Sequence, residues 1–98
     1  MKKGSEIIPV YNLKLYITGA SPNSTKAVAN IKHICEQHLK GRYQLEIIDV
    51  YQASSIAQAE QIIALPLLIK LSPWPRKRLI GNMSDTDKVL KGLELIQQ

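Results

Sequence analysis

The sequence is poor in the features on which several classes of protein depend. It contains one cysteine, Cys35, so it cannot form an intrachain disulfide or a CxxC redox pair, and this thiol alone cannot hold zinc. No low-complexity tract or internal repeat is visible, and no apolar run is long enough for a membrane span. Residues 1–10 carry two lysines but no apolar segment and no small-residue cleavage site. We therefore expect no secretory signal and a cytoplasmic protein.

Motifs for catalysis and for ligand binding are missing as well. The segment GASPNS, residues 19–24, lacks the glycines of a phosphate loop and is not followed by GK[ST]. His33 and His38 are five residues apart, which does not bring them to one helix face, and no carboxylate spacing completes a metal set. No Ser-His-acid set follows from the spacing either. The residues thus indicate no catalytic, metal or cofactor site.

What remains is enough for one globular domain. A chain of 98 residues with 45% hydrophobic content can bury a core, and this composition argues against disorder. We expect a flexible N-terminus over residues 1–10 and a single domain over residues 11–98. The net charge of +5 favours an acidic protein surface, an anionic ligand or nucleic acid as a partner, or it serves solubility alone.

Hydrophobic periodicity organises the first half of the chain. Residues 12–18 alternate with period two and predict a strand, with Leu13, Leu15 and Ile17 on one side and Lys14, Tyr16 and Thr18 on the other. Ser21 is a suitable helix cap, and Pro22 suits the first helical position. The predicted helix ends near Gly41, and its apolar stripe is formed by Ala27, Val28, Ile31, Ile34, Cys35 and Leu39. Residues 43–51 alternate again and predict a second strand.

The pattern also predicts a helix at the C-terminus. We expect Ser84 as its N-cap, acidic residues in its first turn, and an apolar face formed by Val89, Leu90, Leu93 and Ile96. Gly92 lies inside this helix, at a cost of about 1 kcal/mol relative to alanine. It either allows close packing or keeps the helix easy to melt, and the pattern alone favours close packing.

The segment 54–81 permits two interpretations. In the first, Ser54 or Ser55 caps a short helix that ends before Pro66, and strands at 67–71 and 77–81 flank a proline turn. The order is then β-α-β-α-β-β-α, which is a thioredoxin-like α/β arrangement. In the second, a helical pattern from Ile56 to Leu71 is broken at Pro66, with no strand before Leu79. Periodicity cannot separate the two over such short apolar runs.

A thioredoxin-like order raises a redox hypothesis. The reactive CxxC of such proteins lies at the start of the first helix, where this sequence has SPNS. Cys35 lies further along, on the apolar stripe, and we expect it to be a small buried hydrophobe. A thioredoxin-like protein without CxxC, with a redox or other stress-related role, remains the alternative function.

A basic run follows the proline turn. Arg76, Lys77 and Arg78 come directly after Pro73-Trp74-Pro75. Cations beside an aromatic residue can bind single-stranded nucleic acid, but the cluster stands alone and all four tyrosines lie elsewhere in the chain. A solvated edge strand and a protein-binding surface are both favoured over a nucleic-acid site, and we expect neither nucleic acid nor membrane as a partner.

Four segments together resemble the KaiB family of circadian clock proteins over about residues 11–95. They are YNLKLYITGASPNSTKAV, GRYQLEIIDVYQ, IIALPLLIKLSPWPRKRLIGNMS and DKVLKGLEL. The resemblance implies a non-enzymatic protein without cofactors that binds a hexameric KaiC-like ATPase. It would modulate the phosphorylation or ATPase state of that partner in circadian rhythm or stress adaptation, and a KaiA-like protein or a histidine kinase are further implied partners.

The resemblance also implies a metamorphic α/β fold. A ground-state KaiB fold forms dimers and tetramers, and a rarer thioredoxin-like monomer binds the ATPase. The implied partner-binding residues are Lys26, Gln61, Trp74, Arg76, Lys77 and Arg78, and those implied in fold switching are Pro66, Gly92 and Glu94.

The sequence departs from the usual clock pattern at several places. Gln61 replaces a usual lysine, and Ala64-Leu65-Pro66-Leu67, Pro73-Trp74-Pro75 and Gly81-Asn82 differ from the usual residues. The acidic C-terminal tail is also absent. These departures indicate a divergent homologue, non-cyanobacterial or independent of KaiA.

Overall fold

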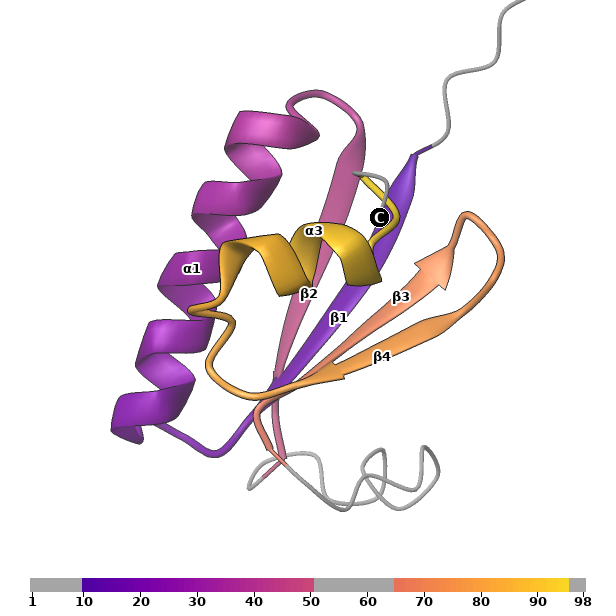
Figure 1. Cartoon of the computed structure of the whole chain (residues 1–98). Helices are drawn as coiled ribbons and strands as arrows, with labels where there is room; N and C mark the ends of the chain where they lie inside the picture. Colours follow the sequence, from indigo (N-terminus) through magenta and orange to yellow (C-terminus); the bar gives the residue numbers. More distant parts are fainter. Residues whose placement is uncertain (1–9, 51–64, 96–98) are drawn as a thin grey trace, which may run out of the picture.

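The computed structural model describes residues 10–50 and 65–95 (Figure 1). In chain order they form β1 (Tyr11–Ile17), α1 (Pro22–His38), β2 (Tyr43–Asp49), β3 (Leu67–Ser72), β4 (Lys77–Ile80) and α3 (Thr86–Gly92). The four strands make one mixed sheet in the order β2-β1-β3-β4. Strands β1 and β2 are parallel, whereas β3 is antiparallel to both β1 and β4. The fold is thus thioredoxin-like, as predicted.

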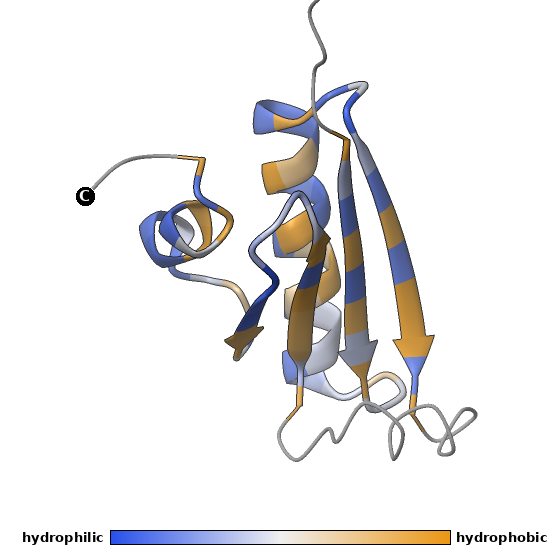
Figure 2. Ribbon diagram, turned by 90° about the vertical axis from the view of Figure 1, so that its right-hand side faces the viewer, coloured by the Kyte–Doolittle hydropathy of each residue, from blue (hydrophilic) through white to orange (hydrophobic). Residues whose placement is uncertain are grey.

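Both helices lie on the same face of the sheet (Figure 1), where they cover the larger core. The buried side chains of this core include Leu13, Leu15 and Leu68 from the sheet, Ile31, Ile34 and Cys35 from α1, and Val89, Leu90 and Leu93 from α3 and its end. The alternation of hydrophobic and hydrophilic residues along β1 is plain in Figure 2. It follows from the period of two in a strand, which sends successive side chains to opposite faces.

A second, smaller core lies on the opposite face. It contains Tyr16, Ile48, Leu67 and Ile69, and Tyr16 is fully buried there. The alternation in β1 therefore separates two buried faces in this part of the sheet, and not a buried face from a wet one. This explains why β3 begins with three consecutive apolar residues, Leu67, Leu68 and Ile69.

The ends of α1 follow the predicted chemistry. The Ser21 side chain accepts a hydrogen bond from the Ser24 backbone N–H at 3.3 Å, and Pro22 is the first helical residue. The helix ends at His38 with Leu39 as its C-cap, and Gly41 then has φ of +78°, a value that favours glycine.

The prediction for the last helix was wrong in its start. Asp85, and not Ser84, is the N-cap, and its carboxylate accepts the Lys88 backbone N–H at 3.1 Å. A carboxylate at this position also suits the helix dipole, so it competes well with a neighbouring serine. Gly92 is the last helical residue, and the expected apolar residue Ile96 lies outside the described part of the chain.

The helix end of α3 forms a Schellman motif around Glu94. The Glu94 N–H donates to the Lys91 carbonyl at 3.0 Å, and the Leu95 N–H donates to the Leu90 carbonyl at 2.8 Å. Glu94 itself has φ of +62°. This left-handed position is normally held by glycine, so a glutamate here indicates that its side chain has a role.

The first of the two interpretations of the ambiguous segment is confirmed for residues 67–80. Residues that the second interpretation placed in a helix, up to Leu71, form β3 in this structure. Pro66 is buried and directly precedes that strand. The predicted helix after Ser54 or Ser55 lies outside the described residues, as do Gln61 and the N-terminal segment before residue 10.

Candidate partner-binding surface

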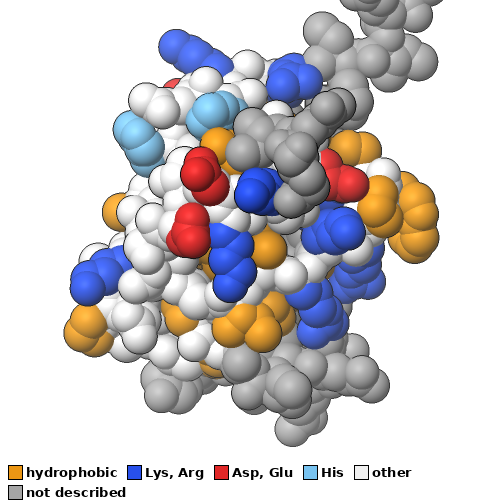
Figure 3. All heavy atoms as spheres, in the orientation of Figure 1, with side chains coloured by type: hydrophobic (Ala, Val, Ile, Leu, Met, Phe, Trp, Pro, Cys, Tyr) orange, Lys and Arg blue, Asp and Glu red, His pale blue; other side chains and the backbone are white. Residues whose placement is uncertain are grey.

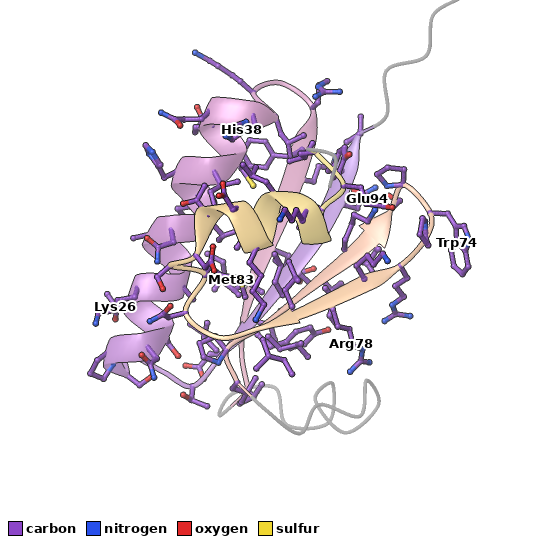
Figure 4. The ribbon with its side chains drawn as sticks, in the orientation of Figure 1. Lys26, His38, Trp74, Arg78, Met83 and Glu94 are labelled. Atoms are coloured by element: carbon purple, nitrogen blue, oxygen red, sulfur yellow. The ribbon has the colours of Figure 1, made fainter. Side chains whose placement is uncertain are left out.

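The turn between β3 and β4 projects from the body of the molecule. The strands pair antiparallel from Leu67 with Ile80 to Lys70 with Lys77, and the turn between them carries Pro73, Trp74 and Pro75. Trp74 is 82% exposed and points away from the sheet (Figure 4). A large aromatic side chain held out in water is a common feature of protein interfaces.

The three cations of the basic run lie beside this tryptophan, and all three are exposed. Lys77 is paired with Lys70 and Arg78 with Ile69, so their side chains leave opposite faces of β4. Figure 3 shows Lys and Arg side chains gathered on the β4 side of the molecule, next to the exposed hydrophobic side chains of the turn. The hairpin thus presents an aromatic tip and a positive strand.

A buried lysine lies on β3, the strand that pairs with this positive strand. Lys70 is only 1% exposed, and its ammonium group donates to Glu94 Oε1 at 3.0 Å. It also lies 5.8 Å from the centre of the Tyr11 ring. This hydrogen bond, with the charge of Lys70, holds the pKa of Glu94 below its usual range. The pair ties the end of α3 to the middle of the sheet.

Gly92 makes the second contact between α3 and the hairpin. A Cβ atom at this position would lie 2.4 Å from Cδ2 of Leu79, far closer than van der Waals contact. The geometry therefore agrees with the close-packing interpretation of Gly92. Two residues that the family resemblance connects with fold switching, Gly92 and Glu94, both meet the β3–β4 hairpin here.

Lys26 lies elsewhere. It is exposed on α1, and Figure 4 shows it on the opposite side of the molecule from Trp74 and Arg78. The structure therefore does not unite all of the predicted partner-binding residues in one patch. Trp74 and the three cations form one surface, Lys26 belongs to another, and Gln61 is not described.

The loop between β1 and α1 is occupied by hydroxyl groups where redox proteins of this fold carry thiols. The buried Ser24 side chain accepts from the Thr18 N–H at 3.0 Å and from the Ser21 hydroxyl at 2.8 Å. At the end of β2, Asp49 accepts the Gly19 N–H at 3.1 Å. These bonds give the polar side chains of this loop a structural role.

Cys35 is buried in the main core. Burial, and to a lesser degree the negative charge of Glu36, raises the pKa of its thiol to about 12. A thiol of this kind is protonated at neutral pH and is a poor nucleophile.

Among residues 10–50 and 65–95, no three His, Cys, Asp or Glu side chains come together as a metal site would require.

Two features of the site escaped prediction from the sequence. One is the buried position of Lys70: the pattern predicts a buried strand at residues 67–71, and the alternation of Lys70 with Leu68 on one face is the signal for a cation inside the core. The other is the contact of Glu36, the neighbour of Cys35, which accepts a hydrogen bond from the Tyr43 hydroxyl at 2.6 Å. This bond raises the pKa of Tyr43 to about 12.

Neither helix in the described part of the chain has the length and apolar content that crossing a bilayer requires.

Comparison with known protein families gives one match over most of the chain. The model of the KaiB domain matches residues 14–95. A protein of Synechocystis named circadian clock protein KaiB3 is 48% identical over 86 residues, which cover 88% of this chain and 84% of that protein. The circadian clock oscillator protein KaiB of Nostoc punctiforme is 42% identical over 88 residues, covering 90% and 85%.

Solved structures confirm the fold. The N-terminal domain of SasA from Synechococcus elongatus superimposes with a TM-score of 0.72 at 19% identity, and the match covers 100% of this chain and 96% of that domain. Chloroplastic thioredoxin z superimposes with a TM-score of 0.71 at 14% identity, covering 89% and 80%. At such low identity these likenesses concern the fold alone.

Proposed function

Because the chain belongs to the KaiB family, we propose that it is a non-enzymatic regulatory protein that binds a hexameric ATPase of the KaiC type. Binding modulates the phosphorylation or ATPase state of that partner, in circadian rhythm or in stress adaptation. A KaiA-like protein or a histidine kinase is a further partner, and the protein acts in the cytoplasm.

The observation that carries this proposal is the hairpin surface of Trp74, Arg76, Lys77 and Arg78. An exposed tryptophan at the tip and consecutive cations from the end of the turn into β4 are suited to a protein partner with negative charge. Lys26, which lies on α1, and Gln61 are further binding residues in this proposal. The Trp74 side chain is 82% exposed, so it adds little to the core.

Co-elution is the direct test. The protein is mixed with the KaiC homologue of the same organism, with and without ATP, and followed by size-exclusion chromatography over hours. We expect a complex that a Trp74→Ala, Lys77→Glu double variant weakens and a Lys40→Glu variant, on an exposed residue beyond α1, leaves intact. No complex under any nucleotide condition would overturn the proposal.

We further propose that the chain exchanges between two folds. The thioredoxin-like form described above is the one that binds the ATPase, and a second form, with a different arrangement of the C-terminal half, assembles into dimers or tetramers. Pro66, Gly92 and Glu94 lie where the hairpin meets the rest of the fold, and this placement supports the proposal. Two packings of one sequence can exchange when they differ by only a few kcal/mol. Amide spectra at increasing protein concentration test it, since two exchanging forms give doubled peaks whose ratio follows the concentration.

The alternative function, a thioredoxin-like protein with a redox or stress-related role independent of the ATPase, has the fold in its favour. The buried Cys35 and the hydroxyl-lined loop argue against thiol exchange. Insulin reduction separates the two functions: activity of the wild-type protein that is lost in Cys35→Ser would support the alternative, whereas the main proposal expects no activity in either protein.

A further inference from the structure

Strand β4 lies at the end of the sheet that the described strands form, and the edge that it turns away from β3 is a candidate site for another strand. In the sheet order β2-β1-β3-β4, β4 pairs with β3 alone among the described strands. The Gly81 N–H donates to the Pro66 carbonyl at 3.0 Å, which sets Gly81 as a residue whose backbone faces β3. Backbone groups alternate along an antiparallel pair, so the backbone N–H and C=O of Ile80 face away from β3.

The side chains around this edge define what could pair with it. Ile80 is 58% exposed at one end of the strand and Trp74 is 82% exposed beyond the other. Between them lie the cations, with Lys77 on the face toward α3 and Arg78 on the other. A strand added here would meet the charge of Lys77 on the face toward α3 and an apolar side chain near each end.

We infer that β4 binds an extended, acidic segment of a partner protein as an added antiparallel or parallel strand. Backbone hydrogen bonds along the edge supply affinity that does not depend on sequence, and the cations select for Asp and Glu. The inference rests on the proposed function in one respect, since it says how the hairpin surface would recognise a protein partner.

A second copy of this chain does not fit the same edge. Symmetric pairing of β4 with β4 would bring the basic runs of two copies, Arg76, Lys77 and Arg78, against one another, in a chain whose net charge is +5. Like charges opposite one another across paired strands are destabilising. Cations on an edge strand thus prevent self-association while they leave the edge open to a segment of opposite charge.

Synthetic peptides test the inference without the ATPase. The probe is a short labelled peptide in which Glu alternates with Val, and its control carries Lys in place of Glu. We expect the acidic peptide to bind, with an affinity that falls as salt rises, and the basic peptide not to bind. Equal binding of both peptides would overturn the inference.

Two variants locate the binding. Lys77→Glu should weaken binding of the acidic peptide by about tenfold or more, whereas Lys32→Glu, an equal charge change on an exposed residue of α1, should have little effect. Ile80→Pro removes the outward N–H and should weaken binding more than Ile80→Ala, which keeps it. If Lys77→Glu binds the peptide as well as wild type does, the site is not on β4.

Hydrogen exchange covers the case in which Ile80→Pro fails to fold. In the wild-type protein, addition of the acidic peptide should slow exchange of the Ile80 amide, while the Leu79 amide, which faces β3, should change little. No slowing at Ile80 would contradict strand addition. A single-stranded oligonucleotide that displaces the peptide at equal concentration would assign the edge to nucleic acid and overturn the inference.

The outcome is separable from that of the proposed function. If the ATPase co-elutes with the protein but the acidic peptide does not bind, the proposed function stands and the edge-strand inference falls. If no ATPase complex forms but the acidic peptide binds with the expected dependence on Lys77, the inference stands and the proposed partner is wrong.

Discussion

The ammonium group of Lys70, buried in the sheet, lies 3.0 Å from the carboxylate of Glu94 just beyond the last helix. Lys70 is 1% exposed, whereas the Glu94 side chain is 48% exposed. The cation is therefore the partner that loses water on folding, and the carboxylate compensates its charge from the surface. Removal of Glu94 would leave a buried cation without its counter-charge, which is more harmful than removal of both partners.

We therefore expect Glu94→Gln to lower the melting temperature at pH 7 by more than the double variant Lys70→Met, Glu94→Gln does. Glu94→Gly is a useful companion, because glycine suits the left-handed φ but also abolishes the ion pair. If the pair matters more than backbone strain, Glu94→Gly is also destabilised. A double variant less stable than Glu94→Gln would contradict this account of the pair.

The same pair predicts a pH dependence. The pKa of Glu94 is lowered in the folded protein from an ordinary value of 4.5, so the folded state favours the ionised carboxylate. The stability that the pair supplies is complete above pH 4.5 and is lost as pH falls through the lowered pKa. Thermal melts should thus show the difference between wild type and Glu94→Gln at pH 7 and little of it at strongly acidic pH.

Gly92 and Leu79 should be coupled energetically. An added Cβ at Gly92 meets the Leu79 side chain at 2.4 Å, and overpacking of this kind costs about 1–3 kcal/mol. Gly92→Ala should thus be less favourable in wild type than in a Leu79→Ala background, by about 1–3 kcal/mol. Urea denaturation of the four proteins of this cycle measures the coupling, and additive effects would exclude the contact.

Ser24 should be important for stability although it is not catalytic. Its buried hydroxyl accepts the Thr18 N–H, and Ser24→Ala leaves that donor without its partner at a cost of about 1–3 kcal/mol. Ser84→Ala is the matched control, because Ser84 is exposed and does not cap α3; it should change the free energy of unfolding by less than about 0.5 kcal/mol. Equal effects of the two variants would contradict the assigned roles.

Cys35 should react only when the protein unfolds. Burial raises its pKa to about 12, so a thiol reagent at pH 8 should modify it at the rate of unfolding and rapidly in denaturant. Its folded pKa lies above the ordinary value of 9.0. Stability supplied by the protonated thiol is therefore present below pH 9 and falls by up to about 1.4 kcal/mol per pH unit between pH 9 and 12. Rapid modification of the native protein would overturn this.

Much of the architecture could be read from local patterns. The period of two in β1 and β2 and the apolar stripe of α1 are strong signals because each repeats over many residues. The start of α3 was misplaced by one residue because Ser84 and Asp85 are both good caps, and which of them accepts the backbone N–H depends on the path of the preceding loop. Burial of Tyr16 was not predictable from β1, because it depends on what covers the other face.

The sequence by itself determined the family, the order of the elements up to β2, the presence of a last helix and the absence of a CxxC pair, because these depend on residue identity and on short-range spacing. Only the tertiary structure decided which distant residues meet. It placed Lys26 far from Trp74 (Figure 4), joined Lys70 to Glu94 across 24 positions, and set Leu79 against Gly92. The contacts of Lys70 with Glu94 and of Leu79 with Gly92 arise from the packing of α3 on the β3–β4 hairpin, and no local pattern specifies that packing.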